Sequence, residues 1–236
     1  MELELNKISA YKVNREDACY KEFVGQVLAV QVTAMAGWTL PHVLQGTSIM
    51  KTDRTKDPFV SAMARLTSNK GALLSVDTLR EIQEILVGGS SQVEFRNTRA
   101  VTDDFRICMC RAEAIPEQLR RAFERYESTK VNPLAGDLGK AIKVSTRLFY
   151  DIWNICPYVY FPSVLANAFL SATLMRQGLP FPISLISASK VADTVKAVRV
   201  AQQGFWDDLP ENLLGLEALV VREIYLGMAN FDQYRL

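Results

Sequence analysis

The chain has 236 residues and a formal net charge of +1, with 49% hydrophobic and 22% charged residues. This composition provides enough apolar side chains for a sizeable core and differs from that of a disordered chain. The balance of charge leaves no overall field that would draw the protein to nucleic acid or to an anionic membrane. Neither nucleic acid nor a membrane is therefore an expected partner.

The cysteines and the first residues bear on the compartment. Four scattered cysteines do not form the dense framework of a small secreted scaffold, which favours a reducing compartment. The first residues alternate charged and apolar side chains and lack the layout of a signal peptide. The most apolar stretch, Phe23 to Leu40, is interrupted by polar residues, whereas a membrane span needs ~20 predominantly apolar residues. A cytoplasmic location is expected, and delivery into a host cell is left open.

Apolar periodicity runs from about Asp17 to Met228 without repeats or linkers, which predicts one domain over residues 1–236. A helix capped by Ser75 or Asp77 is predicted to end at Gly88. The stretch that follows is rich in β-branched and aromatic residues, which predicts a β-hairpin with its turn at residues 102–104.

Helices dominate the rest of the chain. One is predicted from Pro116 to about Asn132, and the next, from Leu138 to about Asn154, carries a broad apolar stripe typical of a central helix. A short loop leads to a second apolar helix from Ser163 to Met175. Two further helices are predicted, roughly Ser184 to Gln203 and Glu211 to Met228. The expected fold class is mainly α with a small β-hairpin flap.

The segment from Ile155 to Pro180 reads ICPYVYFPSVLANAFLSATLMRQGLP. It resembles the signature of the Fic family, in which a hydrophobic residue precedes HPFxDGNGR and a helix that ends in glycine. Phe95 and Arg96 lie where Fic proteins commonly carry a glycine, an aromatic residue and an arginine. The resemblance implies a Fic-like helical bundle with a core at residues 75–180. Residues 1–74 and 181–236 would be flanking helices of the same domain.

The resemblance also locates the residues that would transfer AMP, and most of them are replaced. Pro157 agrees with the signature, and Tyr158 is a conservative replacement of phenylalanine. Cys156 stands where the family's histidine takes a proton from the target hydroxyl. Tyr160 stands where an acidic residue holds magnesium. The degenerate positions therefore give no catalytic residue and no metal site.

The phosphate contacts of the signature are replaced as well. Phe161, Pro162 and Ser163 stand for a glycine, an asparagine and a glycine whose backbone donors let phosphate approach a helix N-terminus. Pro162 has no N–H to donate. Val164 replaces the arginine that would pair with phosphate, and Asn167 sits where many members carry a second arginine. No cofactor is therefore expected.

The cysteines and the single histidine allow two interpretations. Cys156 is either a nucleophile or a small residue packed at the end of the core helix, and packing is favoured because His42 is distant in sequence. Cys108 and Cys110 alternate on the predicted hairpin, but cysteine metal sites usually need a second pair.

Two groups of residues are candidates for binding. Ligand-pocket candidates lie at the aromatic loop, whose rings either fill a collapsed pocket or orient a ligand through their hydroxyls; they are Tyr158, Tyr160, Phe161, Ser163 and Asn167. Candidates in the flap would accept an extended peptide of a protein partner by strand addition, which is how Fic proteins hold their targets; they are Val93, Phe95 and Arg96.

The favoured function is a Fic-like protein that has lost AMP transfer and acts as a binding or regulatory module. The alternative is a transferase with another donor, such as a nucleotide sugar, as plant-pathogen avirulence effectors with a Fic-like fold suggest. It would need convergent donors such as Arg96, Arg99, Arg147 or Arg176. A third interpretation is an unrelated helical protein with an accidental match. The sequence does not specify the target, the donor or the oligomeric state.

Overall fold

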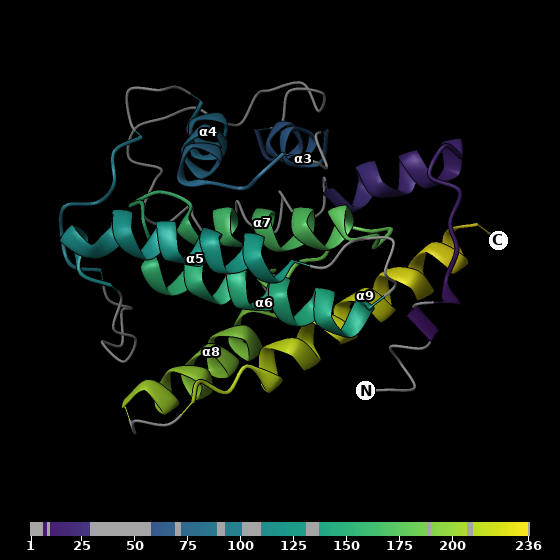
Figure 1. The fold of residues 1–236 in the computed structure, drawn as a ribbon. Coiled ribbons are helices and arrows are strands. Elements are labelled where there is room, and N and C mark those ends of the chain that lie inside the picture. The colour runs from purple at the N-terminus through teal and green to yellow at the C-terminus, as the bar shows by residue number, and fades with distance from the viewer. Residues whose placement is uncertain are drawn as a thin grey trace.

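The computed structural model describes residues 7–8, 10–28, 58–68, 72–88, 93–100, 110–130, 137–187, 190–206 and 210–235. Within these residues the structure is helical, as Figure 1 shows. Residues 18–28 are helical. The labelled elements that follow are α3 (Pro58–Ser68), α4 (Val76–Val87), η3 (Ala112–Ala114), α5 (Ile115–Thr129), α6 (Leu138–Ile155), α7 (Pro162–Arg176), α8 (Val191–Trp206) and α9 (Leu214–Tyr234).

Helix α4 begins and ends where its sequence predicts. The Ser75 hydroxyl accepts the N–H of Thr78 at 3.2 Å and caps the first turn. Gly88 ends the helix with a φ of 75° and donates its N–H to the Glu84 carbonyl at 3.0 Å. Such a left-handed residue satisfies the last carbonyls of a helix, and glycine adopts this conformation without a steric penalty.

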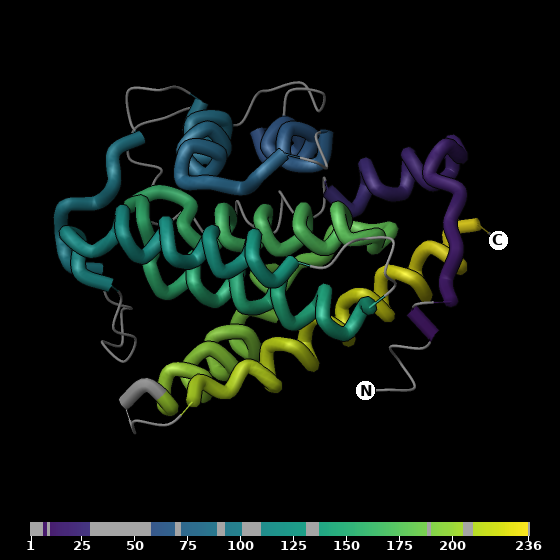
Figure 2. Tube along the Cα trace, viewed as in Figure 1, coloured from purple at the N-terminus to yellow at the C-terminus, as the bar shows by residue number. Residues whose placement is uncertain are grey.

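Helices α6 and α7 pack side by side in the centre of the bundle, as the sequence predicts (Figure 2). Asp137 caps α6 by accepting the N–H of Lys140 at 2.9 Å. Helix α7 has 12 of its 15 residues buried, so it is covered on nearly every side. A helix that is apolar all round belongs in a core. Helix α5 packs against α6, and α3 packs against both α4 and α7.

The helix predicted from Ser184 begins only at Val191. Residues 183–185 are bonded instead to side chains of α7. The Asn167 amide donates to the Ile183 carbonyl at 3.2 Å and accepts the Leu185 N–H at 3.0 Å. The Ser171 hydroxyl donates to the same Ile183 carbonyl at 2.6 Å. Because these backbone groups are used by tertiary contacts, they cannot start a helix.

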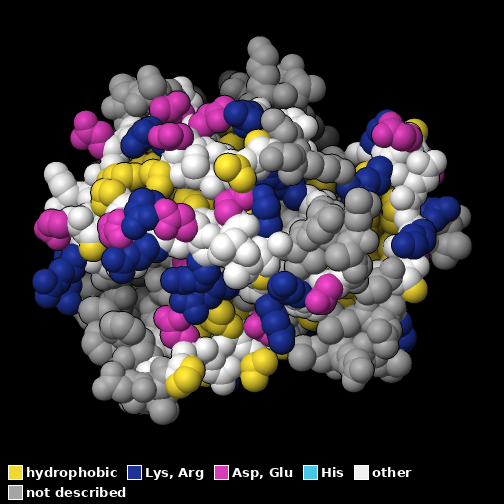
Figure 3. All heavy atoms as spheres, in the orientation of Figure 1, with side chains coloured by type: hydrophobic (Ala, Val, Ile, Leu, Met, Phe, Trp, Pro, Cys, Tyr) yellow, Lys and Arg dark blue, Asp and Glu magenta, His cyan; other side chains and the backbone are white. Residues whose placement is uncertain are grey.

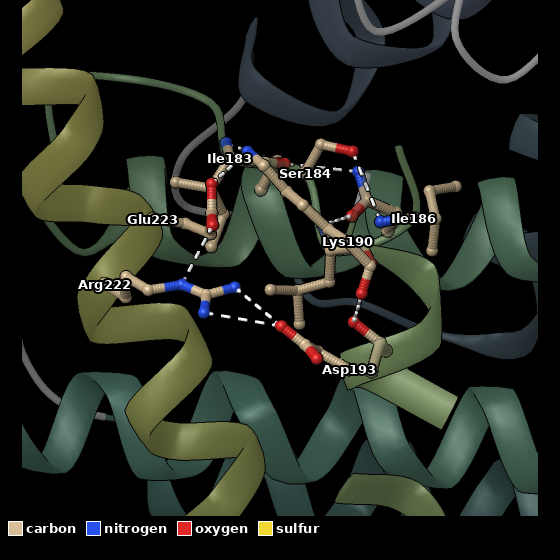
Figure 4. A network of polar contacts seen from close by, with 11 residues as sticks. Ile183, Ser184, Ile186, Lys190, Asp193, Arg222 and Glu223 are labelled. Carbon is tan, nitrogen blue, oxygen red and sulfur yellow. Dashed lines mark hydrogen bonds and ion pairs between the residues drawn. The ribbon is translucent and has the colours of Figure 1, made fainter. Parts of the chain in front are cut away.

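An ion-pair network joins the start of α8 to α9, as Figure 4 shows. Lys190 pairs with Glu223, whose side chain is 4% exposed. Arg222 lies between the two helices, with Nη2 at 3.4 Å from Asp193 Oδ2 and Nε at 3.5 Å from Glu223 Oε1. A carboxylate this buried needs cationic partners, so the network fixes the register of α8 on α9.

The β-hairpin expected around the flap is not seen in the described residues. Residues 93–100 form no strand, and the Arg96 N–H donates to the Pro157 carbonyl at 2.9 Å. The Cys110 N–H donates to the Asn154 carbonyl at 3.2 Å. Both segments are therefore anchored to the end of α6 and its following loop. The predicted turn, Cys108 and His42 lie outside the described residues.

Aromatic side chains join the N-terminal helical residues to α9. The ring of Phe23 lies 5.4 Å from that of Phe181 and 5.1 Å from that of Phe231, measured between centroids. Tyr20 packs on the same two rings. In the part of the chain that the structure describes, no helix combines the length and hydropathy needed to cross a bilayer. The extent of the domain, residues 1–236 with a core at 75–180, stays a prediction.

Candidate functional site

The loop between α6 and α7 contains two residues in the left-handed conformation. Cys156 ends α6 with a φ of 46°, and Phe161 precedes α7 with a φ of 54°. This conformation is costly for any residue that carries a Cβ. Phe161 stands where the resembling signature has a glycine. The loop therefore has a backbone suited to glycine, with a large side chain in glycine's place.

Aromatic side chains pack around this loop. Tyr158 is 2% exposed, and its ring lies 5.4 Å from the ring of Phe95, over which the guanidinium of Arg80 lies at 5.8 Å. Burial raises the pKa of Tyr158, and the charge of Arg80 offsets this rise only in part. Its hydroxyl has no hydrogen-bond partner among the described residues. Tyr160 is 43% exposed, and its carbonyl accepts the Gln83 amide at 2.8 Å.

The first turn of α7 offers few groups to an anion. It begins with Pro162, which has no N–H, and Phe161 contributes no side-chain cap. Ser163 is half-buried, and Val164 is buried. Asn167 lies one turn further along, fully buried, with its amide bonded to Ile183 and Leu185. Its amide is therefore engaged by the segment after α7.

Arg96 is buried and donates only to backbone carbonyls in its described hydrogen bonds. Its Nε donates to Cys156 at 2.6 Å, its Nη1 to Thr98 at 2.6 Å, and its Nη2 to Ile155 at 3.0 Å and to Cys110. The carbonyls of Ile155 and Cys156 lie at the C-terminal end of α6, where the helix dipole favours a cation. Arg96 therefore fastens the flap segment to the end of α6.

Arg176, the second buried arginine considered as a donor, lies at the other end of α7. Its Nη2 donates to the carbonyl of Ala72, just before α4. Arg96 and Arg176 thus both donate to backbone carbonyls.

Cys156 lies in a setting that disfavours a thiolate. Its Sγ is 3.9 Å from the Tyr158 carbonyl. Burial raises the pKa of the Cys156 thiol, and the nearby Arg96 offsets this only in part. Nucleophilic cysteines need the opposite shift. In the described ranges, no group of three or more His, Cys, Asp or Glu side chains is placed to hold a metal ion.

A cavity of about 820 Å³ lies beside the last turns of α6. Its described walls come from Asn97 and Arg99, from residues 110–114, from α5 and α6, and from Gln202 and Glu211. They include no residue of the loop at 156–164. Arg99 and Arg147, two of the donors considered for an altered transferase, line this cavity instead of the loop.

Ion pairs form one wall of the cavity. Asp151 accepts from Arg147 Nε at 2.9 Å and from Arg125 Nη1 at 2.8 Å, and Arg147 Nη1 lies 2.5 Å from Glu211 Oε2. The guanidinium of Arg147 lies 5.5 Å from the centroid of the Tyr150 ring. Burial and the charge of Glu211 raise the pKa of Tyr150 to about 12. Sequence reasoning missed this wall, although Arg147 and Asp151 are spaced as an i, i+4 pair on one helix face.

The helical arrangement, with two core helices joined by this short loop, is that of the Fic domain. The chain superimposes on a Fic-1 fragment from C. elegans with a TM-score of 0.64 and 16% identity, covering 99% of this chain and 69% of that one. A second, substituted form of the fragment gives a TM-score of 0.62 at 18% identity, with the same coverage. A Fic domain containing signaling protein from Bacteroides thetaiotaomicron superimposes with a TM-score of 0.65 and 12% identity. This match covers 98% of this chain and 96% of that one.

These likenesses show that the chain has a Fic fold. The comparison with protein-family models found no match, and the search of curated proteins found none either. The fold is thus recognisable in space over nearly the whole chain, at a low level of sequence identity.

Proposed function

We propose that this protein is a Fic-fold binding or regulatory module that does not transfer AMP. The observation that carries the proposal is the first turn of α7, where Pro162 lacks a backbone donor and Val164 is buried. Residues 156–164, CPYVYFPSV, contain no charged side chain. A triphosphate needs backbone donors and cations to offset its charge.

The surroundings of the loop support the same conclusion. Arg96 donates to four carbonyls, and Asn167 is bonded to the segment after α7. Within the loop, the ring of Tyr158 packs against that of Phe95 at an interplanar angle of 36°. Turning Arg96 toward a phosphate would leave several backbone carbonyls without their donor, each at a cost of about 1 to 3 kcal/mol where buried.

The flap segment supports a role in binding. Val93 and Arg96 are buried against the protein, whereas Glu94 and Asn97 are exposed. Of the backbone N–H groups of residues 93–100, that of Arg96 donates to a backbone carbonyl among the described residues. A segment anchored on one side presents its other side to a partner, so we propose that residues 93–96 accept a peptide by strand addition.

A transfer assay tests the proposal. The protein is incubated with magnesium and ATP labelled in the α-phosphate, in a lysate and alone, beside an active Fic enzyme as a positive control. We expect no labelled AMP on any protein above a sample without the chain. In a thermal-shift titration, a bound nucleotide at a hundred times its Kd would add about 2.7 kcal/mol of stability. Transfer of label that disappears in Cys156→Ala would contradict the proposal.

The alternative transferase is tested in the same lysate with nucleotide sugars. Intact-mass spectrometry of the labelled proteins would show a sugar or nucleotide added to a target. Such an addition, dependent on the protein, would replace the proposal of a non-catalytic module by the alternative.

A further inference from the structure

The cavity beside α6 differs from the loop because it gathers cationic side chains around open space. Arg99, Arg111, Arg125 and Arg147 all line it, and its volume of about 820 Å³ is that of a ligand-sized cavity. Its described acidic residues are Glu113, Asp151 and Glu211. Among the described lining residues, four arginines against three carboxylates leave an excess of one positive charge. The cavity therefore favours an anion.

Much of the hydrogen-bonding capacity of two arginines is unused in the described contacts. A guanidinium has five N–H donors. Arg125 donates to Asp151 through Nη1, and no other hydrogen bond of its side chain occurs among the described residues. The side chain of Arg111 makes no hydrogen bond or ion pair within the same residues. A carboxylate that reaches both side chains would gain charge-assisted hydrogen bonds without displacing the existing pairs.

The ion pairs on the wall hold Arg125 ready for such a ligand. Asp151 is 10% exposed in its side chain and binds both Arg125 and Arg147. Arg147 is in turn held by Glu211. Because the pair with Asp151 restricts Arg125 in the free protein, less conformational entropy is lost when a ligand binds.

The flap segment supplies part of the cavity wall. Asn97 and Arg99 both line the cavity, one on each side of the bend at Thr98, and both are exposed. A peptide lying along residues 93–100 would therefore pass the mouth of the cavity. One of its side chains would then be placed to enter.

We propose that this cavity receives an acidic side chain of an extended segment from a protein partner, with its carboxylate between Arg111 and Arg125. The inference rests on the proposed function as a binding module and names the chemical class of its partner. Its test measures peptide binding, whereas the proposed function is tested by AMP transfer, so each can fail without the other.

The probe is a fluorescein-labelled octapeptide of alternating glutamate and valine, followed by fluorescence anisotropy at low ionic strength. We expect it to bind the wild-type chain. Arg111→Ala with Arg125→Ala raises its Kd by at least about tenfold. The matched control is Arg120→Ala with Arg121→Ala, which removes two arginines from the exposed face of α5. The control changes the Kd by less than about twofold, and circular dichroism establishes that both variants fold.

A change of specificity adds an independent measurement. Arg111→Glu is expected to weaken binding of the glutamate peptide and to strengthen binding of the same peptide with lysine in place of glutamate. The proposal is overturned if the wild-type chain does not bind the glutamate peptide. It is overturned equally if the cavity and control variants lose the same affinity, or if the glutamine analogue binds as well. Stabilisation by pyrophosphate alone, dependent on Arg111 and Arg125, would also overturn it in favour of a small phosphate ligand.

Discussion

The loop after α6 and the cavity beside α6 lie at the same end of one helix, but they use arginine differently. At the loop, Arg96 is buried and bonded to four backbone carbonyls. At the cavity, Arg125 and Arg147 are bonded to carboxylates and still face open space. The first arrangement holds the fold together, and the second leaves donors for a ligand.

The difference shows that arginines in one fold can have different partners. Buried carbonyls need donors, and a helix C-terminus attracts a cation even when no substrate is present. What decides the role of each arginine is how many of its N–H groups the protein already uses. The following measurements test this contrast, from the largest expected effect to the smallest.

Arg96→Ala should produce the largest loss of stability. It removes the donor of four carbonyls, two at the end of α6 and the others at Thr98 and Cys110, so we expect the free energy of unfolding to fall by about 3 kcal/mol in urea titrations. The Arg111 side chain has no described partner to lose, so Arg111→Ala should change the free energy of unfolding by less than about 0.5 kcal/mol. Equal effects of the two substitutions would remove the contrast between loop and cavity.

Asp151→Asn should have a smaller effect, because its partners remain partly solvated. The substitution weakens two ion pairs on the cavity wall, whose arginine side chains are 47% and 31% exposed. We expect a loss of about 2 kcal/mol in the free energy of unfolding, below the cost of breaking a fully buried pair. Glu16→Gln, in an exposed pair with Lys21, should leave chemical denaturation unchanged. A cost for Asp151→Asn no larger than for this control would show that the wall is not preorganised.

Cys156 should react slowly with alkylating agents. Because burial raises its thiol pKa, less thiolate is present near neutral pH in the folded than in the unfolded chain. We expect iodoacetamide to modify Cys156 at least about tenfold more slowly in the native protein than in guanidinium, as measured by peptide mass spectrometry. Modification of Cys156 faster in the native state would instead favour a nucleophile at the loop.

Phe161→Gly should have the smallest effect. Glycine relieves the left-handed backbone by about 1 kcal/mol but loses the packing of a half-buried ring and gains entropy in the unfolded chain. These contributions nearly cancel, so we expect a change below about 1 kcal/mol in unfolding titrations. Gly88→Ala, at a φ of 75° with no atom near the added Cβ, isolates the backbone cost as a loss of about 1 kcal/mol. A loss well above that for Phe161→Gly would make its ring an essential part of the core.

Much of the helical framework follows from sequence because its signals are local. Ser75, Gly88 and Asp137 mark helix ends through their own side chains or backbone, and the structure has α4 and α6 at those positions. The start of α8 could not be predicted from sequence, because Ser171 and Asn167 of α7 bind the backbone of residues 183–185. Such a contact has no local signal.

The site could be predicted only in part for the same reason. The resemblance places the loop at residues 156–164, but the partners of Arg96 are carbonyls up to 60 residues away in the chain. The cavity joins Asn97 and Arg99 to α5, α6 and Gln202, so no single stretch of sequence contains it. The pair of Arg147 and Asp151 was its one local signal, and an i, i+4 pair alone is common on exposed helices.

The burial of α7 on nearly all sides has a consequence for how the molecule opens. Helices α3, α4 and α6 all touch it, and its side chains hold residues 183–185. No covering element can detach without exposing α7 to water, so opening there should be cooperative. The amides of α7 should then be among the slowest to exchange with deuterium, at a rate set by global unfolding.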